Sequence, residues 1–321
     1  MRAITVHQYG GPDVLTEEDI QERQPGPGEA LVRLEAVGVN FIDIYQRRGF
    51  YPGSLPFVAG NEGAGLIEAV GPGVSGVVPG DRVAYAMVPG AYAECAVVPA
   101  SRIVRLPEDI DAPTAAALML QGLTAHYLTR SVFPLKPDDT MVVHAAAGGL
   151  GLLLVQVGKR IGATVIGLTS TLEKARVVEN AGADVVLLST RLDFDAEVRR
   201  LTGGRGAEVV YDSVGKDTFR RSLDCLRPRG YLVLVGQASG PVPQIEIPLL
   251  AKRSLFFTRP GLAHYIATHD EVMARASELF DWHRVGALRV RIDRTLPLSQ
   301  AADAHRRLES RESAGKILLV P

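Results

Sequence analysis

Hydrophobic and polar positions alternate over short stretches through roughly the first 125 residues. ALVRLEAVGV, GLIEAVG, DRVAYAMV and AECAVV are such stretches, and PGPGE, GPGVSG and PG lie between them. Alternation with a period of two predicts half-buried strands, and turns rich in glycine and proline predict antiparallel connections. We therefore expect residues 1–125 to form a compact β-rich domain with little helix before about residue 112.

After PLKPDD the pattern changes to continuous apolar runs that alternate with helical stretches. MVVHAAA, TVIGLTS, DVVLLS, EVVYDSV and YLVLVG are the apolar runs, and GLLLVQVGKRIG and TLEKARVVENAG are two of the helical stretches. Apolar strands linked by helices are typical of a parallel sheet that is buried on both faces. Residues 126–260 are thus predicted to form a doubly wound α/β domain of the Rossmann type.

The remaining segment, residues 261–321, lies outside this alternation. It contains a helical stretch, HDEVMARASELFDWHR, a strand, LRVRIDRTLP, a further helix and a final strand, KILLVP. The final strand needs a partner in a sheet. We expect the segment to return to the first domain, which then comprises residues 1–125 and 261–321.

Composition and charge narrow the class of protein. Of 321 residues, 46% are hydrophobic and 22% are charged, with a formal net charge of -1. This charge gives no general attraction to nucleic acid or anionic lipid. No apolar run reaches the length of a membrane span, and the first residues lack the pattern of a secretory signal. The sequence predicts a cytoplasmic protein with no membrane contact, and nucleic acid is disfavoured as a partner.

A glycine-rich stretch, HAAAGGLG at residues 144–151, stands between an apolar strand and a helical stretch. A turn there points backbone N–H groups at a pyrophosphate from a helix N-terminus. Gly148 allows close approach of a phosphate, and Gly151 allows close packing of the helix. Ala146 replaces the first glycine of G-x-G-x-x-G, which is tolerated if its φ stays negative. A purely structural turn is the alternative to a cofactor site formed by Ala147, Gly148, Gly149, Leu150 and Gly151.

The end of the second strand of this domain, TVIGLTS, bears on the choice of nucleotide. NAD-selective sites carry an acidic residue there, which accepts hydrogen bonds from the ribose hydroxyls. Here Ser170 stands near that point, and Lys174 follows one turn into the next helix. The missing carboxylate and the added cation favour a 2′-phosphate, so NADPH is predicted rather than NADH. In the competing interpretation Lys174 is a solvated surface residue.

The order of a β-rich domain, a later Rossmann domain and a returning C-terminus resembles the medium-chain dehydrogenase/reductase superfamily over essentially the full length. Zinc-dependent members carry a cysteine in the first domain, a Gly-His-Glu run and a loop with four cysteines. Here GVNFID places Asn40, and AGNEGAG places Asn61 and Glu62, at the first two of these sites, and the loop is missing. Without thiolates or paired histidines a tetrahedral zinc site is not assembled. The sequence predicts a reductase that acts without a metal.

Among zinc-free members the chain is similar to the NADPH:quinone oxidoreductases of the zeta-crystallin-like family. The resemblance is carried by GVNFIDIYQRRGFYP, AGNEGAG, LQGLTAHYL, HAAAGGLG, VVYDSVG and FTRPGL. It implies a GroES-like catalytic domain, a Rossmann NADPH-binding domain, and transfer of reducing equivalents from NADPH to a quinone held between them. One-electron and two-electron reduction are not separated by the sequence. The alternatives are an NADPH-dependent enone or 2-alkenal reductase and a non-catalytic RNA-binding or crystallin-like structural protein.

The resemblance also implies site residues. It places Asn40, Tyr45 and Tyr51 near the nicotinamide and the substrate, and Arg259 where a guanidinium can stabilise charge on a quinone oxygen. Packing of the two tyrosines and an ion pair of Arg259 are the competing interpretations. Beyond the glycine turn, the implied cofactor residues are Thr124, Ser170, Lys174, Ser189, Gly236, Gln237 and Arg311.

Two positions depart from the family pattern. Ser189 stands where relatives tend to have tyrosine, and Gln121 replaces a residue that is often lysine in relatives. Their roles stay open. The resemblance further implies a homodimer, formed through segments near QIEIPLLAKRSLFFT.

Overall fold

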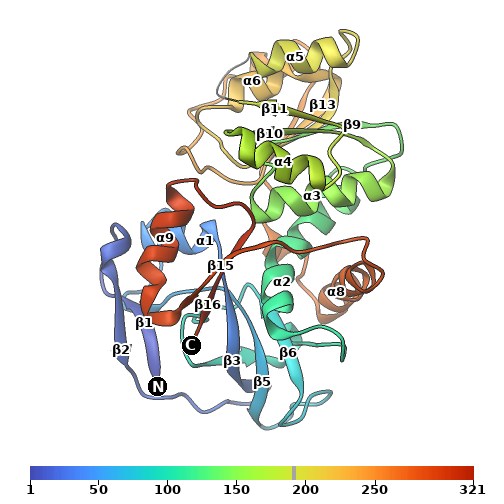
Figure 1. The fold of residues 1–321 in the computed structure, drawn as a ribbon. Helices are drawn as coiled ribbons and strands as arrows, with labels where there is room; N and C mark the ends of the chain where they lie inside the picture. The colour runs from blue at the N-terminus through green and yellow to red at the C-terminus, as the bar shows by residue number, and fades with distance from the viewer. Residues whose placement is uncertain (190–192) are drawn as a thin grey trace. The chain divides into compact units, whose positions relative to one another are not determined.

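The structure is a computed structural model that describes residues 1–189 and 193–321 (Figure 1). It divides into two compact units. The first unit contains Met1–Leu123, Ile266–Val285 and Val290–Pro321, and the second contains Thr124–Tyr265 and Gly286–Arg289. The predicted combination of a β-rich part with a parallel Rossmann-type sheet is confirmed.

The first unit is built on two sheets. A seven-stranded sheet has the order β15-β16-β3-β5-β6-β8, with β7 paired to β3, and a three-stranded sheet has the order β2-β1-β4. The strands are β1 (Arg2–Val6), β2 (Leu15–Asp19), β3 (Glu29–Val39), β4 (Phe57–Val58), β5 (Glu62–Val70), β6 (Arg82–Ala86), β7 (Cys95–Pro99), β8 (Val104–Arg105), β15 (Ile292–Pro297) and β16 (Lys316–Val320).

The helices around these sheets are few until late in the chain. Only the short α1 (Phe41–Arg47) precedes α2 (Ala112–Tyr127) among the α-helices of the described part, as the alternating pattern predicted. The later helices are α8 (His269–Arg284) and α9 (Ala301–Glu309), and single 3₁₀ turns lie at Pro12–Val14, Ala100–Arg102 and Leu298–Gln300.

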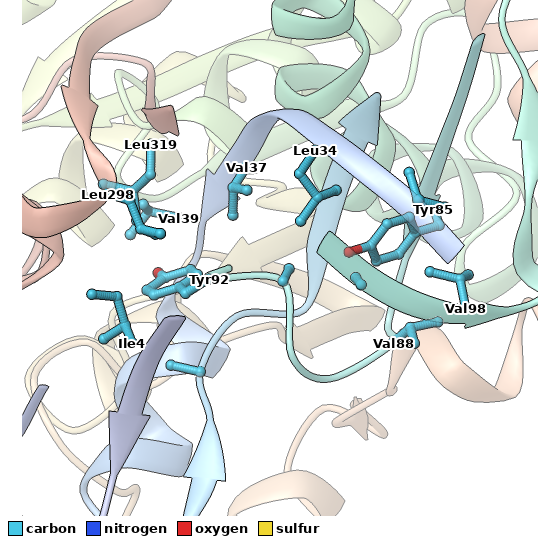
Figure 2. Packing of buried hydrophobic residues seen from close by; sticks show 14 of the residues in the cluster. Ile4, Leu34, Val37, Val39, Tyr85, Val88, Tyr92, Val98, Leu298 and Leu319 are labelled. Atoms are coloured by element: carbon cyan, nitrogen blue, oxygen red, sulfur yellow. The ribbon is translucent and has the colours of Figure 1, made fainter. Parts of the chain in front are cut away.

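The core of the first unit joins strands from both ends of the chain (Figure 2). Val37 and Val39 of β3 and Leu319 of β16 are each at most 1% exposed. β16 pairs antiparallel with β3, and Leu319 lies opposite Val37. The apolar final strand is therefore buried against β3, and its first residue, Lys316, is carried into the interior with it.

The second unit holds a six-stranded sheet in which every pair is parallel and the order is β11-β10-β9-β12-β13-β14. The strands are β9 (Thr140–Val143), β10 (Thr164–Thr169), β11 (Val185–Leu188), β12 (Ala207–Asp212), β13 (Leu226–Leu234) and β14 (Phe256–Thr258). The helices are α3 (Gly149–Ile161), α4 (Leu172–Asn180), α5 (Phe194–Leu201), α6 (Phe219–Asp224) and α7 (Ile247–Ala251), a π-helical turn spans Leu128–Val132, and a 3₁₀ turn spans Leu262–His264.

The strand order reverses on either side of β9, which lies between β10 and β12. In such sheets ligands collect outside the carboxyl ends of the strands at the reversal. All residues of β9 and β12 are buried, which explains their continuous apolar runs. Within the described ranges, no helix combines the length and the apolar character needed to cross a bilayer.

Candidate functional site

The glycine-rich turn connects β9 to α3 in the second unit. Gly148 is the N-cap of α3 in an extended conformation, with φ -70° and ψ 166°, and no side chain of the described residues caps this helix. A Cβ built on Gly151 lies 2.5 Å from the carbonyl oxygen of Ala145, so only glycine fits there. The uncapped N–H groups of the first helical turn are therefore available to an anion.

The two alanines before this turn, Ala145 and Ala146, differ in the sign of their backbone φ angle. Ala145 adopts a left-handed conformation with φ 46°, whereas Ala146 is not among the residues of the described chain with positive φ. Ala146 is fully buried, and a Cβ built on Gly167 of β10 lies 3.2 Å from its methyl group. The condition under which alanine replaces the first glycine of the fingerprint is thus met.

Ser170, Ser189 and Lys174 surround the carboxyl end of β10. Ser170 follows the strand directly, and the Ser189 hydroxyl donates to the carbonyl oxygen of Thr169 at 3.1 Å. α4 begins beside them with Thr171 as its N-cap, whose hydroxyl accepts from the backbone N–H of Lys174 at 3.2 Å. Two serines therefore stand at the carboxyl end of β10, and Lys174 lies on the first turn of the helix that follows.

Gly236 and Gln237 follow β13, on the other side of the strand reversal. A Cβ built on Gly236 lies 2.8 Å from the carbonyl oxygen of Ser213, so the two loops pack backbone to backbone. Gln237 is buried, with 7% of its surface exposed. Thr124 on α2 is also buried, and Arg259, directly after β14, is exposed; both belong to this same unit.

A buried polar network that sequence reasoning missed holds the loop after β12. Asp212 is fully buried, and its Oδ1 accepts from the backbone N–H groups of Val214 at 2.8 Å and Gly215 at 3.0 Å. Its Oδ2 accepts from the Ser222 hydroxyl at 2.8 Å, and Ser222 lies 2.9 Å from Nε2 of His144. Because the Ser222 proton goes to Asp212, Nε2 of His144 must donate. Burial lowers the pKa of His144, which agrees with a neutral ring.

The cluster in the first unit is centred on Asn40, the N-cap of α1. Its backbone N–H donates to Asp43 at 2.8 Å, and its side-chain Nδ2 donates to the carbonyl oxygen of Gly38 at 3.1 Å and to Glu62 at 2.9 Å. Its Oδ1 accepts from Nζ of Lys316 at 2.8 Å. Lys316 also pairs with Glu62 at 2.5 Å. An amide, a carboxylate and an ammonium thus share one buried site.

Tyr45 and Tyr51 lie together at the end of α1. Their rings meet edge to face at 90° with centroids 5.7 Å apart. Tyr45 is buried and also lies 6.0 Å from Phe41 and 6.3 Å from Phe50, whereas Tyr51 is 43% exposed. The same unit holds Arg311, an exposed residue after α9 with φ 59°. The structure therefore makes Tyr45 a packed residue and leaves Tyr51 accessible.

A second network, also missed from the sequence, anchors α1 to α9. Nη1 of Arg47 lies 3.0 Å from Nδ1 of His305, and the Tyr92 hydroxyl lies 3.0 Å from Nε2 of His305 and 2.9 Å from Asp43. Because arginine only donates, Nδ1 accepts and Nε2 carries the proton. Burial, followed by the charge of Arg47, lowers the pKa of His305 to about 3. Burial raises the pKa of Asp43 to about 6 against three hydrogen bonds that lower it.

The residues around Asn40 do not fit a zinc ion. Zinc sites in proteins use thiolate, imidazole and carboxylate ligands. Here the oxygen donors beside Asn40 are the carboxylates of Asp43, which accepts from the Asn40 backbone N–H, and of Glu62, which already pairs with the buried ammonium of Lys316. Across residues 1–189 and 193–321, no group of three or more His, Cys, Asp or Glu side chains is placed to hold a metal ion. A second cation at this site would be repelled by Lys316.

Comparison with known proteins agrees with this architecture. Residues 26–108 match the family described as the alcohol dehydrogenase GroES-like domain, and residues 149–281 match the family described as zinc-binding dehydrogenase. A quinone oxidoreductase from Pseudomonas aeruginosa is 46% identical, covering 100% of this chain and 99% of the relative. A 2-haloacrylate reductase from a Burkholderia species is 42% identical, covering 99% of this chain and 98% of the relative.

Solved structures give the same result. The quinone oxidoreductase of Escherichia coli, complexed with NADPH, is 41% identical and superimposes with a TM-score of 0.98. The match covers 100% of both chains. Identity at this level over the full length establishes kinship and not only a shared fold. The chain belongs to the quinone oxidoreductase family of the medium-chain dehydrogenases/reductases.

Proposed function

We propose that this chain is an NADPH-dependent quinone reductase. The observation that carries the proposal is the uncapped glycine turn at Gly148, whose fit is set by Gly151, in a chain that matches an NADPH complex over its full length. NADPH, when bound, supplies the hydride. In this proposal the NADPH-binding domain comprises residues 126–260, and the catalytic domain comprises residues 1–125 and 261–321.

The cofactor is held by residues at the carboxyl ends of the parallel strands. The pyrophosphate lies on the backbone of Ala147, Gly148, Gly149, Leu150 and Gly151, where the helix dipole of α3 favours negative charge. Lys174, on the first turn of α4, binds the 2′-phosphate, and Ser170 and Ser189 face the adenosine ribose. Arg311 adds a second cation for the phosphate. Thr124, Gly236 and Gln237 bind the remainder of the nucleotide.

The reacting rings are oriented rather than chemically activated. Tyr51 forms an accessible aromatic wall that Tyr45 supports from the core side. Arg259 supplies positive charge for the oxygen of the quinone as electrons arrive. Holding two flat rings in reactive contact lowers a barrier by several kcal/mol, roughly 7–11 in the best cases. Asn40 contributes to the shape of the site from within its buried cluster.

The test is initial rates of NADPH oxidation with 1,4-benzoquinone and 9,10-phenanthrenequinone. Turnover of at least one quinone, with NADH as a poorer donor, is expected. Absence of turnover with every quinone, while NADPH still binds, would remove this proposal. A Gly151→Val variant is the negative control. Its side chain obstructs the turn, so no turnover is expected from it.

A second candidate reaction is reduction of an activated carbon–carbon double bond. The 42% identity to a 2-haloacrylate reductase favours it, because the same hydride donor serves both acceptors. The same assay with 2-chloroacrylate and a 2-alkenal ranks the two reactions. A higher kcat/KM for either compound than for both quinones would reverse our order.

The proposal includes a cytoplasmic homodimer. Both cysteines, Cys95 and Cys225, are free and buried, as is usual in a reducing compartment. β14 ends the order of the six-stranded sheet, so one edge of it has no neighbour among the described strands. Ile247 is 78% exposed and Phe256 of β14 is 49% exposed. A second copy paired along β14 would satisfy the strand edge and cover both apolar side chains.

A further inference from the structure

The cluster around Asn40 leaves one hydrogen-bonding atom unfilled, and that atom belongs to Gln121. Both N–H groups of the Asn40 amide are used, by Gly38 and by Glu62. The other oxygen of Glu62 accepts from the backbone N–H of Leu120. Nζ of Lys316 donates to Asn40 and to Glu62, so every side-chain nitrogen and oxygen of these three residues has a partner.

The orientation of the Gln121 amide follows from this arrangement. Oδ1 of Asn40 faces the ammonium of Lys316 and must be an acceptor. The atom of Gln121 that lies 3.4 Å from this oxygen must then be the donor, Nε2. Its Oε1 is directed elsewhere. That oxygen is shielded from solvent and has no hydrogen-bond partner in the described part of the chain.

A shielded acceptor without a donor is costly, and native proteins keep few of them. Gln121 lies on α2, and the neighbouring Asn40 does not supply the missing donor, because both N–H groups of its amide are donated to Gly38 and Glu62. A donor brought by a ligand would fill it. A quinone does not meet this need, because its carbonyl oxygens only accept.

We propose that Oε1 of Gln121 accepts a hydrogen bond from a donor on the ring bound at this site. The inference rests on the proposed function, which offers two such donors. One is the N–H of the nicotinamide carboxamide, and the other is the O–H of the quinol product. Asn40, Glu62 and Lys316 are positioning residues that fix the orientation of Gln121.

The first experiment tests the carboxamide. Reduced 3-acetylpyridine adenine dinucleotide phosphate replaces the carboxamide by a group without N–H. Its dissociation constant and that of NADPH are measured by protein fluorescence for the wild type and for Gln121→Met. If the carboxamide is the donor, the wild type binds NADPH about 2- to 10-fold more tightly than the analogue. Gln121→Met then binds the two equally.

The second experiment tests the product in the same two proteins. Inhibition constants are compared for 1,4-benzoquinol and for 1,4-dimethoxybenzene, which lacks the O–H. If the quinol is the donor, the wild type favours the quinol by about the same factor and Gln121→Met loses that preference. Discrimination that is unchanged by the substitution in both experiments would overturn the proposal.

Two further variants make the result specific. Gln121→Leu removes the same oxygen with a side chain of different shape and is expected to lose the discrimination as methionine does. Gln156→Met removes a glutamine whose amide is fully bonded within the second unit, to Leu152 and Arg289, and is expected to leave the discrimination unchanged. Wild-type protein that fails to bind NADPH would remove the proposed function itself, which is a different outcome from binding that ignores Gln121.

Discussion

Lys316 and Glu62 form an ion pair in the interior of the first unit, with 2.5 Å between Nζ and Oε2 and side-chain exposures of 2% and 0%. The pair joins the first residue of β16 to the first residue of β5. Removal of two charges from water is costly, and each charge is tolerated only because the other is present. The Asn40 amide bonds to both partners, so the same pair fixes the start of α1.

Lys316→Met is expected to lower the free energy of unfolding by about 3–5 kcal/mol, because it leaves the Glu62 carboxylate buried without a counter-ion. Glu62→Gln combined with Lys316→Met removes both charges and should cost clearly less than Lys316→Met alone. Urea unfolding of Lys316→Met, Glu62→Gln, the double variant and the wild type measures the difference. A double variant that is as unstable as the sum of the single variants would show that the charges do not depend on each other.

Gly151→Ala is expected to weaken NADPH binding by about 10-fold or more, since the added Cβ meets backbone atoms that cannot move aside without shifting the turn. The dissociation constant is measured by fluorescence titration. Gly11→Ala is the matched control, because nothing lies within 4 Å of a Cβ built there. Equal NADPH affinity in Gly151→Ala and the wild type would remove the turn from the cofactor site.

Lys174→Ala is expected to weaken NADPH binding by roughly 10- to 100-fold and NADH binding by much less, because a charge-assisted contact to phosphate is worth about 1.5–3 kcal/mol. The ratio of kcat/KM for the two nucleotides reports the effect. Lys136→Ala, at an exposed lysine before β9, serves as the control for loss of one surface charge. An unchanged ratio would assign the 2′-phosphate to another residue.

Ile247→Lys is expected to convert a dimer into a monomer, because it places a charge on the most exposed of the large hydrophobic side chains in the described structure. Light scattering gives the mass in solution. Val285→Lys changes a side chain of similar exposure, 71%, in the other unit and should leave the mass unaltered. A wild type that is monomeric at micromolar concentration would contradict the dimer directly.

The second unit was predictable because its signals are local. Continuous apolar runs indicate buried strands, and Gly148 and Gly151 indicate a tight turn between a strand and a helix. The polar residues that follow β10 could be located because they come directly after an apolar run. The alanine at position 146, in place of the first glycine of the fingerprint, was also interpretable from the sequence. It requires only that φ stay out of the positive range, and the structure meets this requirement.

The cluster in the first unit was not predictable in the same way. Asn40, Glu62, Gln121 and Lys316 come from four elements, and only the pairing of β16 with β3 carries the last of them into the interior. A lysine at the start of an apolar strand is normally exposed. The sequence identified Asn40 and Glu62 by resemblance, but the ammonium between them and the unfilled oxygen of Gln121 depend on tertiary packing.

His305 gives the stability of this protein a specific dependence on pH. Its pKa of about 3 in the folded chain lies below the ordinary value of 6.5, so the unfolded chain binds a proton first as the pH falls. This favours unfolding by up to about 1.4 kcal/mol per pH unit between those two values. Asp43 acts in the opposite direction, because its pKa of about 6 lies above its ordinary 3.8 and the folded chain binds that proton first.

The two contributions therefore oppose each other between about pH 6 and pH 4 in the wild type, and a His305→Gln substitution separates them. Glutamine can accept from Arg47 and donate to Tyr92, as the neutral ring does. The variant is expected to gain stability relative to the wild type as the pH falls below 6.5, by up to about 1.4 kcal/mol per unit. Urea unfolding from pH 7 to pH 4.5 measures the gain. Parallel stability curves for the two proteins would mean that the pKa of His305 is the same in the folded and the unfolded chain, against the lowering that burial and Arg47 produce.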